Sequence, residues 1–396
     1  MSSSSPPSRP PRPLQQRQPK RHRSAREIAL AGVARETNAV LPAVLAALPH
    51  LRPAESEFLD ADSGDLPPLE PNECPRLVPA RVAVRVVNED SFNAAIEMAG
   101  RVRAAQAQAQ QQLQQGSGTG AGTGTGGSTS TSSGSNSAGG GSGSGSANAM
   151  ADRVAVLNLA SDRTPGGGWL NGATAQEEAL CYRSSLALSL HRRHYPWRRP
   201  AAQGMYTRDV VVVRGAMDQG HALLVPGVPA RDLPVFSVLS VAGLRRPEIA
   251  AVNVIDTTAT ATASGGAGSA GTTSAGSGAS GSTSGSASGS KKAAAAVGFR
   301  RKEVFERVSD RESTKARMRM TLRMAARRGH RLLVLGALGC GAFKNPVEDV
   351  AECWLEVLRE PEFRGGWWRE VWFAVYDRRN EGNFEVFERI LGGKEV

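Results

Sequence analysis

Short apolar runs alternate with helix-like segments along most of the chain, and this alternation restricts its fold more than any other feature. Residues 153–161, RVAVLNLAS, form a β-branched apolar run whose length suits a buried strand. Similar strand patterns occupy residues 81–87, 209–215, 233–243, 331–335 and 367–377. Helical patterns fall between these runs. The chain is therefore predicted to form an α/β sheet covered by helices on both faces.

Two helices carry recognisable start signals. Ser24 and Glu27 form an S-x-x-E capping box ahead of IALAGVARETNAVL. Before VEDVAECWLEVL, Asn345, Pro346 and Glu348 predict an N-cap, an N1 proline and an N3 acid. These signals set expected boundaries for the first helix and for the helix that follows strand 331–335.

Low-complexity stretches interrupt this pattern twice. They consist almost wholly of Gly, Ser, Thr and Ala, and they carry too little apolar surface to offset the entropy lost on ordering. We therefore predict one domain, residues 24–396, with flexible insertions at about 105–150 and 257–296. A Pro-, Ser- and Arg-rich tail, residues 1–23, is predicted to be disordered.

The formal net charge of +11 is concentrated in that tail. The tail holds Arg9, Arg12, Arg17, Lys20, Arg21 and Arg23 and no acid, which is more than half of the excess. A basic tail suits nucleic acid, another polyanion or an import receptor, although a merely solvated tail has the same composition. Contact with nucleic acid is expected only through this segment.

Cysteine usage and hydropathy indicate the compartment. The four cysteines, Cys74, Cys181, Cys340 and Cys353, are scattered and form no CxxC pair. Cys181 and Cys340 flank the glycine-rich loops described next, and we interpret them as small buried side chains. The N-terminus lacks the apolar core of a secretory signal, and we expect no membrane span. These features predict a reduced intracellular protein, nuclear or cytoplasmic.

Two glycine-rich loops each follow a predicted strand. SDRTPGGGWLNGATA comes after residues 153–159, and GALGCGAF comes after residues 331–335. Loops at the carboxyl ends of strands meet at one edge of such a sheet, and glycines there let the backbone approach an anion. Neither loop matches GxxxxGK[ST] or GxGxxG, which disfavours a P-loop or a Rossmann site. The pair suggests a diphosphate ligand.

Glu177 and Glu178 follow the first loop, in the first turn of the next helix and about 100° apart around it. Acids in a first turn are often explained by the helix dipole alone. The short tether, however, holds a carboxylate beside whatever the glycines bind, and a nearby diphosphate raises the pKa of a carboxyl group. A candidate general acid for glycosidic cleavage results, although the helix dipole acts in the opposite direction.

The segment GGGWLNGATAQEE resembles the GGG-x(6–8)-QEE signature of poly(ADP-ribose) glycohydrolases, in particular the bacterial-type catalytic domain. The segments VRVVNEDSFNAA, VLNLASDRTPGGGWLNGATAQEEALCYRSSL, MYTRDVVVVRG, LLVLGALGCGAFKNPVEDVA and VWFAVYD follow the order and spacing of that family. The resemblance covers residues 24–392 apart from the insertions. It implies a macrodomain-like three-layer α/β/α fold with a mixed central sheet. Ordinary ADP-ribose-binding macrodomains lack the paired glutamates.

The resemblance also implies residue roles. Glu178 would protonate the leaving oxygen of the ribose–ribose bond, and Glu177 would bind ribose hydroxyls. Ligand-binding positions implied in the same way are Asn158, Gly166, Gly167, Gly168, Gln176, Gly339, Cys340, Gly341, Ala342 and Phe343. The reaction would need no metal and no cofactor. The implied partner is poly(ADP-ribose) or ADP-ribosylated protein, bound by a monomer.

Two other function classes remain as alternatives. A catalytically silent reader would bind ADP-ribose or chain ends, but it has no use for the second carboxylate. A nucleic-acid-binding protein would depend on the basic tail, and deletion of residues 1–24 would then abolish its binding while sparing hydrolysis in an enzyme.

Further features have more ordinary explanations. His191 and His194 have an i, i+3 spacing that can chelate zinc, but they lie among arginines without nearby ligands. The basic helix 313–328 is interpreted as a solvated face rather than a polyanion site. Trp169 is expected to be a lid over the site or a surface-packing residue.

Overall fold

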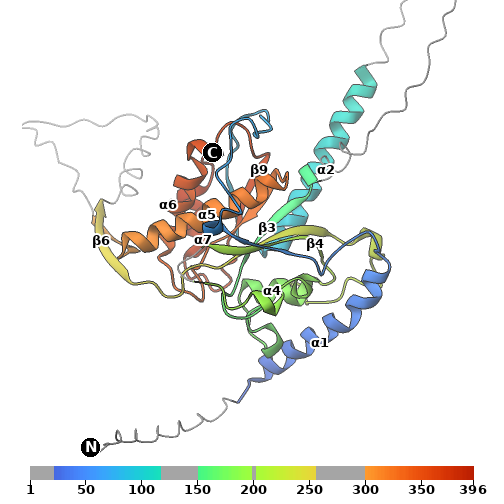
Figure 1. Cartoon of the computed structure of the whole chain (residues 1–396). Helices are drawn as coiled ribbons and strands as arrows, with labels where there is room; N and C mark the ends of the chain where they lie inside the picture. The colour runs from blue at the N-terminus through green and yellow to red at the C-terminus, as the bar shows by residue number, and fades with distance from the viewer. Residues whose placement is uncertain (1–21, 117–149, 199–201, 256–298) are drawn as a thin grey trace, which may run out of the picture.

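A seven-stranded sheet runs through the computed structural model, which describes residues 22–116, 150–198, 202–255 and 299–396 (Figure 1). The strands are β1 (Glu57–Asp60), β2 (Arg85–Val87), β3 (Val154–Leu159), β4 (Gln203–Val211), β5 (Val235–Val241), β8 (Leu332–Leu335) and β9 (Glu370–Ala374), in the order β1-β4-β5-β3-β8-β9-β2. Neighbours from β5 to β2 run parallel, whereas β4 is antiparallel to β5 and to β1. The sheet is therefore mixed, as predicted.

Helices cover both faces of the sheet. The helices are α1 (Ala25–Ala46), α2 (Ser91–Gly116), α4 (Gln176–Arg183), α5 (Val308–Arg327), α6 (Val347–Leu358) and α7 (Asn383–Leu391). Along β3, Val156 packs in the cluster that contains Phe92 of α2, and the alternate residue Leu157 packs in the cluster that contains Met318 of α5. This alternation follows from the two-residue period of a strand. The predicted three-layer α/β/α architecture is confirmed.

Trp354 of α6 links one helical layer to the sheet. It is 0% exposed, its ring meets Phe373 edge-on at 5.5 Å between centroids, and its Nε1 donates to the Gly336 carbonyl at 3.2 Å. We expect Trp354→Ala to lower the free energy of unfolding by about 3–5 kcal/mol, because it leaves a large cavity and an unpaired carbonyl. Urea denaturation checks this value, and a loss below about 1 kcal/mol would contradict the described packing.

The start of α6 differs from the sequence prediction. Asn345 does not cap the helix. Pro346 is the N-cap residue, and the Asn345 amide donates instead to the carbonyls of Leu244, at 2.6 Å, and Gly339, at 3.0 Å. By contrast, the predicted capping box at α1 is confirmed, with Glu27 N–H donating to Ser24 Oγ at 3.2 Å.

Helix α1 has an apolar composition that the sequence analysis underrated. By length and hydropathy alone it would pass as a membrane-crossing helix. Six of its residues, Leu30, Ala31, Ala34, Thr37, Leu41 and Val44, are nevertheless buried in the domain. Thr37 Oγ1 donates to the Tyr182 carbonyl of α4 at 2.7 Å. Helix α1 therefore braces the helix that carries the two glutamates.

Several arginines of the basic helix α5 are paired with glutamates rather than freely solvated. Arg319 bonds both oxygens of Glu360 at 2.8 Å, and Arg323 bonds Glu362 at 2.6 and 2.8 Å. Arg311 binds Glu356 of α6 in the same way. Its arginines thus serve to hold α5 to neighbouring segments.

Several predicted segments lie outside the described residues, namely residues 1–21 and most of both expected insertions. Helix α2 continues to Gly116, beyond the expected boundary near residue 105. Two strands, β6 (Ile249–Ile255) and β7 (Phe299–Phe305), form a separate antiparallel pair on either side of the gap at residues 256–298 (Figure 1). Strand β7 and edge strand β1 were not predicted.

Candidate active site

The glycine loop between β3 and α4 bends tightly around two carboxylates. Gly166 and Gly167 have φ values of 65° and 58°, a region that favours glycine. A Cβ atom on Gly167 would lie 2.3 Å from Glu178 Oε1 and 3.1 Å from Glu177 Oε2. Position 167 therefore requires glycine, because a Cβ atom there would collide with the protein's own carboxyl groups.

Glu178 is held by this loop through one oxygen only. The Gly168 N–H donates to Glu178 Oε1 at 2.8 Å. The other oxygen, Oε2, is buried and has no hydrogen-bond partner among the described residues. A buried polar atom without a partner is costly, and such atoms concentrate at functional sites. Among the four oxygens of Glu177 and Glu178, Oε2 of Glu178 is the one without a hydrogen-bond partner among the described residues.

Glu177 lies deeper, at 2% exposure. Its Oε2 accepts the Ser161 N–H at 2.8 Å, and its Oε1 accepts Asn158 Nδ2 at 3.4 Å. The pKa of Glu177 is raised to about 8. Burial is the largest cause and the neighbouring Glu178 adds to it, whereas the hydrogen bonds that Glu177 accepts act against the shift. Glu177 consequently keeps its proton at neutral pH, which makes it a hydrogen-bond donor as well as an acceptor.

The raised pKa of Glu177 predicts a loss of stability at alkaline pH. The ordinary pKa of the group is 4.5 and the folded value is about 8. The folded state therefore binds the extra proton between these values, and its free energy of unfolding should fall as pH rises toward 8, by at most about 1.4 kcal/mol per pH unit. Glu177→Gln should flatten this dependence. Urea denaturation at pH 6 and pH 9 compares the two proteins, and equal slopes would contradict the burial of a protonated Glu177.

Gln176 and Asn158 connect the glutamates to the sheet. Gln176 Oε1 accepts the Leu159 N–H at 2.8 Å, and its Nε2 donates to the Leu157 carbonyl at 2.8 Å and to Ser91 Oγ at 3.0 Å. Asn158 is 0% exposed, so it lies behind Glu177 and supports it. Together these amides fix the start of α4 to the carboxyl end of β3.

The second glycine loop, residues 336–343, packs on the end of β5. A Cβ on Gly243 would lie 2.7 Å from the Gly339 Cα, and one on Gly339 would lie 2.5 Å from Asn345 Nδ2. Cys340 donates its N–H to the Ala337 carbonyl at 3.1 Å, so this amide is already used. The backbone N–H groups of Gly341, Ala342 and Phe343 donate to no other group within the described part of the chain. These three amides are suited to an anion.

Arg245 joins the two loops, and the sequence analysis did not identify it. Its guanidinium lies 4.1 Å from the centre of the Phe343 ring, and its Nη2 donates to Asp162 Oδ1 at 3.1 Å. Its Nε is buried without a partner among the described residues. Asp162 follows β3, Arg245 follows β5 and Phe343 follows β8. The only available sequence signal was a basic residue after a predicted strand, within LRRP.

Two residues of α4 fix the loop and the helix, and the sequence analysis missed both. The Tyr182 hydroxyl lies 2.7 Å from the Trp169 carbonyl and 3.0 Å from the Ala173 carbonyl, at the far side of the glycine loop. Arg183 is 1% exposed and forms an ion pair with Asp90 at the start of α2. Both contacts join residues that are separated in the sequence, and no sequence motif marks Tyr182 or Arg183 as a residue of the site.

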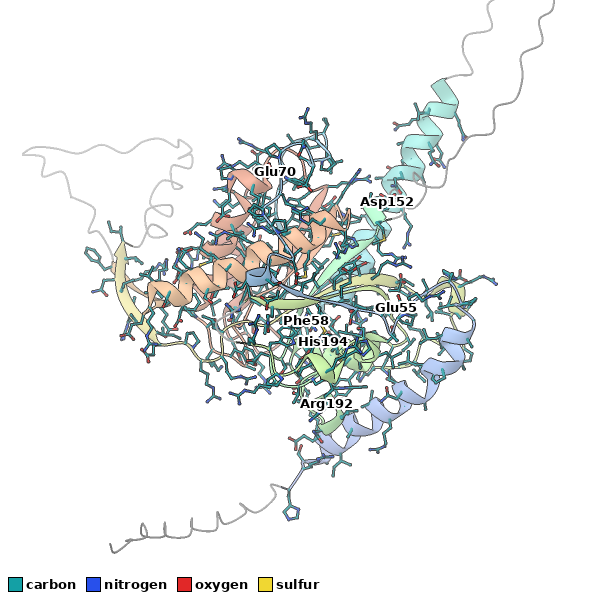
Figure 2. The ribbon with its side chains drawn as sticks, viewed as in Figure 1. Glu55, Phe58, Glu70, Asp152, Arg192 and His194 are labelled. Carbon is teal, nitrogen blue, oxygen red and sulfur yellow. The ribbon has the colours of Figure 1, made fainter. Side chains whose placement is uncertain are left out.

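Several other candidates take structural roles. Trp169 is buried at 5% exposure and meets Tyr182 edge-on, so it is neither a lid nor a surface residue. His194 stacks on Phe58 at 4.6 Å (Figure 2). Burial raises the pKa values of the Cys181 and Cys340 thiols, which keeps both protonated. The described residues contain no group of three or more His, Cys, Asp or Glu side chains that could hold a metal ion.

Comparison with protein families bears directly on this loop. Residues 72–214 match the family model described as microbial-type PARG, catalytic domain. The family resemblance predicted from the sequence is confirmed. The matched range contains the glycine loop and both glutamates, whereas the second loop lies beyond it. The PARG-type segment thus includes the carboxylates whose geometry is described above.

Solved structures show the same fold over most of the chain. Poly(ADP-ribose) glycohydrolase from Thermomonospora curvata aligns with a TM-score of 0.52 at 20% identity, covering 91% of this chain and 99% of that one. The structure titled as this enzyme bound to the inhibitor ADP-HPD aligns with a TM-score of 0.51 at 20% identity, with the same coverage. No curated protein sequence matches the chain significantly.

Proposed function

We propose that this protein is a poly(ADP-ribose) glycohydrolase, a hydrolase that releases ADP-ribose, with Glu178 as its general acid and base. The match to the PARG catalytic domain supports the enzyme class. One structural observation carries the assignment of Glu178. Its Oε1 is fixed by the Gly168 N–H, while its buried Oε2 has no hydrogen-bond partner among the described residues. A reader of ADP-ribose would gain nothing from such an atom.

The proposed reaction begins with proton donation from Glu178 Oε2. The proton passes to the ribose 2′-oxygen that links two ADP-ribose units, and the bond from that oxygen to the distal anomeric carbon breaks. An oxocarbenium-like carbon forms on the distal ribose. Water then attacks this carbon while Glu178, now ionised, takes the proton from the water. The atoms balance with one water consumed for each bond cleaved.

The groups around Glu178 are proposed to bind the substrate and to set the charge of the site. Glu177, protonated at neutral pH, would hydrogen-bond the hydroxyls of the distal ribose. The amides of Gly341, Ala342 and Phe343 would bind the diphosphate, whose negative charge favours the neutral form of a nearby carboxyl group. The Arg245 guanidinium, fixed between the two loops, would add a positive charge to that anion site. In this scheme the carboxyl groups and the anion-binding amides need no metal or cofactor.

The substrate is proposed to be poly(ADP-ribose) or ADP-ribosylated protein. The decisive experiment incubates the purified full chain with poly(ADP-ribose) of defined length and resolves the products by size. Shortened chains together with free ADP-ribose are the expected result. Polymer that is bound but never shortened would instead assign the protein to the readers, and polymer that is neither bound nor cut would refute the proposed substrate.

A further inference from the structure

Strand β6 presents an edge that no other described strand covers. Figure 1 shows it at the periphery of the domain, away from the seven-stranded sheet. It pairs with β7 on one side, and within the described ranges no strand pairs with it on the other. Proteins commonly protect such an edge with a lysine, a proline, a bulge or a very short strand. The seven residues of β6, IAAVNVI, include no proline and no charged residue, and their register with β7 is continuous. The edge is therefore open to another strand.

The hydrogen bonds around the pair show which backbone groups of β6 point away from β7. The Glu306 N–H donates to the Glu248 carbonyl at 3.0 Å, so these two residues form a hydrogen-bonded pair directly before β6. Hydrogen-bonded and non-hydrogen-bonded pairs alternate along an antiparallel ladder, so the next bonded pairs contain the even-numbered residues of β6. The Phe305 N–H, opposite Ile249, accordingly turns away from β6 and donates to Asp349 Oδ2 at 3.0 Å.

Four residues of β6 consequently direct their backbone N–H and C=O groups outward. They are Ile249, Ala251, Asn253 and Ile255. Among the described residues, these groups form no backbone hydrogen bond to another segment. A row of free donors and acceptors of this kind is the template on which a further strand pairs.

Apolar side chains are exposed along the same strand. Ile249, Val252 and Ile255 are exposed at 37%, 40% and 59%. Phe299 of β7, which lies opposite Ile255, is exposed at 70%. Burial of these side chains would add a hydrophobic contribution to the backbone hydrogen bonds of an added strand. The edge therefore offers both components of a strand-to-strand interface.

Strand β7, rather than β6, carries the charged contacts that hold the pair to the domain. Its Arg300 and Lys302 form ion pairs with Glu348 and Glu352 of α6. Because β6 has no charged side chain, it takes part in no such contact. Helix α6 is thus joined to the inner strand of the pair, and β6 is the outer strand.

The sequence of β6 is complementary to itself about its central residue, Val252. When two copies pair antiparallel with Val252 opposite Val252, Ile249 lies opposite Ile255 and Ala251 lies opposite Asn253. All four outward residues of each strand then meet outward residues, and large apolar side chains meet at both ends. A shift by two residues would leave Ile249 or Ile255 of each strand without a partner in the other. No charged side chain opposes another at any position.

We propose that β6 is a dimerisation edge, across which two copies of the chain join their β6–β7 pairs into one four-stranded antiparallel sheet. A two-fold axis at Val252 would make the contact isologous, with the same residues contributed by both copies. A second copy is favoured over an unrelated peptide because β6 complements itself in register, in side-chain size and in its lack of charge. The protein is then a dimer, whereas the family resemblance implied a monomer. This proposal does not depend on the catalytic function.

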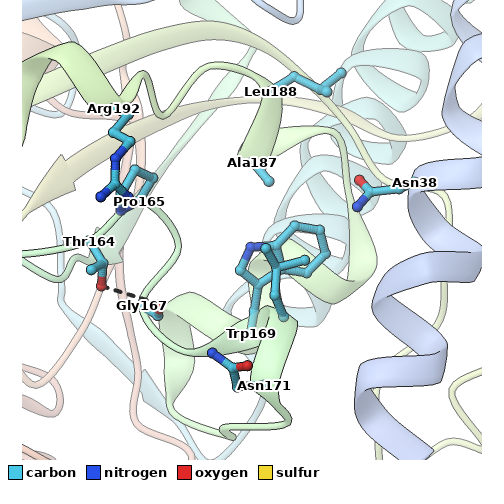
Figure 3. Close-up of a pocket in the computed structure, with 10 residues that line it drawn as sticks. Asn38, Thr164, Pro165, Gly167, Trp169, Asn171, Ala187, Leu188 and Arg192 are labelled. Carbon is cyan, nitrogen blue, oxygen red and sulfur yellow. Dashed lines mark hydrogen bonds between the residues drawn. The ribbon is translucent and has the colours of Figure 1, made fainter.

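The mass of the full chain in solution tests the dimer. Sedimentation equilibrium over a range of concentrations should reveal a species of twice the chain mass of 41.7 kDa. Ala251→Pro should shift the protein to monomer, because it removes an outward N–H and leaves the bonds between β6 and β7 in place. Leu188→Glu is the matched control and should remain dimeric. Leu188 is exposed at 37%, like Ile249, but it lines the cavity beside the glycine loop (Figure 3).

Two double variants test the register. Ala251→Lys with Asn253→Lys places like charges directly opposite each other on both sides of the axis. Ala251→Lys with Asn253→Glu places opposite charges at the same positions, and both sites are exposed in the single chain. Facing side chains interact across an antiparallel pair, so the dimer of the first variant should dissociate at least about tenfold more readily than that of the second. Circular dichroism checks that each variant is folded.

Three results would overturn the proposal. A chain that stays monomeric at every concentration would leave the edge to an extended segment of a different protein. A dimer that persists in folded Ala251→Pro, or that Leu188→Glu disrupts equally, must form through another surface. Equal dissociation of the two double variants would exclude the register centred on Val252.

Discussion

Glu178→Gln is expected to lower turnover of poly(ADP-ribose) by about 10²–10⁴-fold, the usual contribution of general acid–base catalysis. The amide keeps the shape of the side chain and can still accept the Gly168 N–H at the Oε1 position. It has no proton of suitable acidity to give to the leaving oxygen. Affinity for ADP-ribose should change little. Single-turnover kinetics on polymer and calorimetric titration with ADP-ribose measure the two quantities separately.

Glu177→Gln is the matched control for this loss. Glu177 is already neutral at pH 7, so its amide replaces a group of equal charge and similar size. Its turnover should fall less than that of Glu178→Gln. Should the two variants lose turnover equally, or should Glu178→Gln keep full activity, the division of roles between the adjacent glutamates would be wrong.

The position of the two glutamates could be predicted from the sequence, but their environment could not. The sequence analysis places Glu177 and Glu178 in the first turn of the helix that follows the first glycine-rich loop, and both lie in the first turn of α4. The sequence suggested that the glycines serve the ligand. In the structure, the Gly168 amide holds Glu178, and Gly167 makes room for both carboxyl groups. Backbone direction within a glycine loop is set by tertiary packing, because glycine has no strong preference of its own.

The two covered faces of the sheet were also predictable, whereas the links across the site were not. Successive side chains of a strand point to opposite faces, so Val156 and Leu157 of the continuous apolar run in β3 could be expected in different layers. The connection from Asp162 through Arg245 to Phe343 joins the ends of three different strands. Nothing local in the sequence marks such a contact. The role of Asn345 could not be predicted for the same reason. Its amide donates to the carbonyls of Leu244 and Gly339 instead of capping the adjacent helix.

Gly167→Ala should reduce turnover by about 10²-fold, the penalty associated with a misplacement of about 1 Å in an active site. The new Cβ would lie 2.3 Å from Glu178 Oε1, at a φ of 58°. Glu178 cannot yield cheaply, because it is buried and its Oε1 accepts the Gly168 N–H at 2.8 Å. The carboxyl group must leave this amide, which removes the geometry that presents Oε2. The left-handed backbone adds about 1–2 kcal/mol of destabilisation.

Gly100→Ala in α2 separates this effect from the general cost of adding a methyl group. A Cβ on Gly100 would meet nothing within 4 Å, so this variant should keep full turnover and gain slight stability from better helix propensity. Thermal unfolding checks that Gly167→Ala remains folded at the assay temperature. Full turnover in a folded Gly167→Ala protein would mean that the catalytic proton does not come from a carboxyl group held against this glycine. The contact between loop and carboxylate would then be a packing feature, and the acid would have to be sought elsewhere along the cleft.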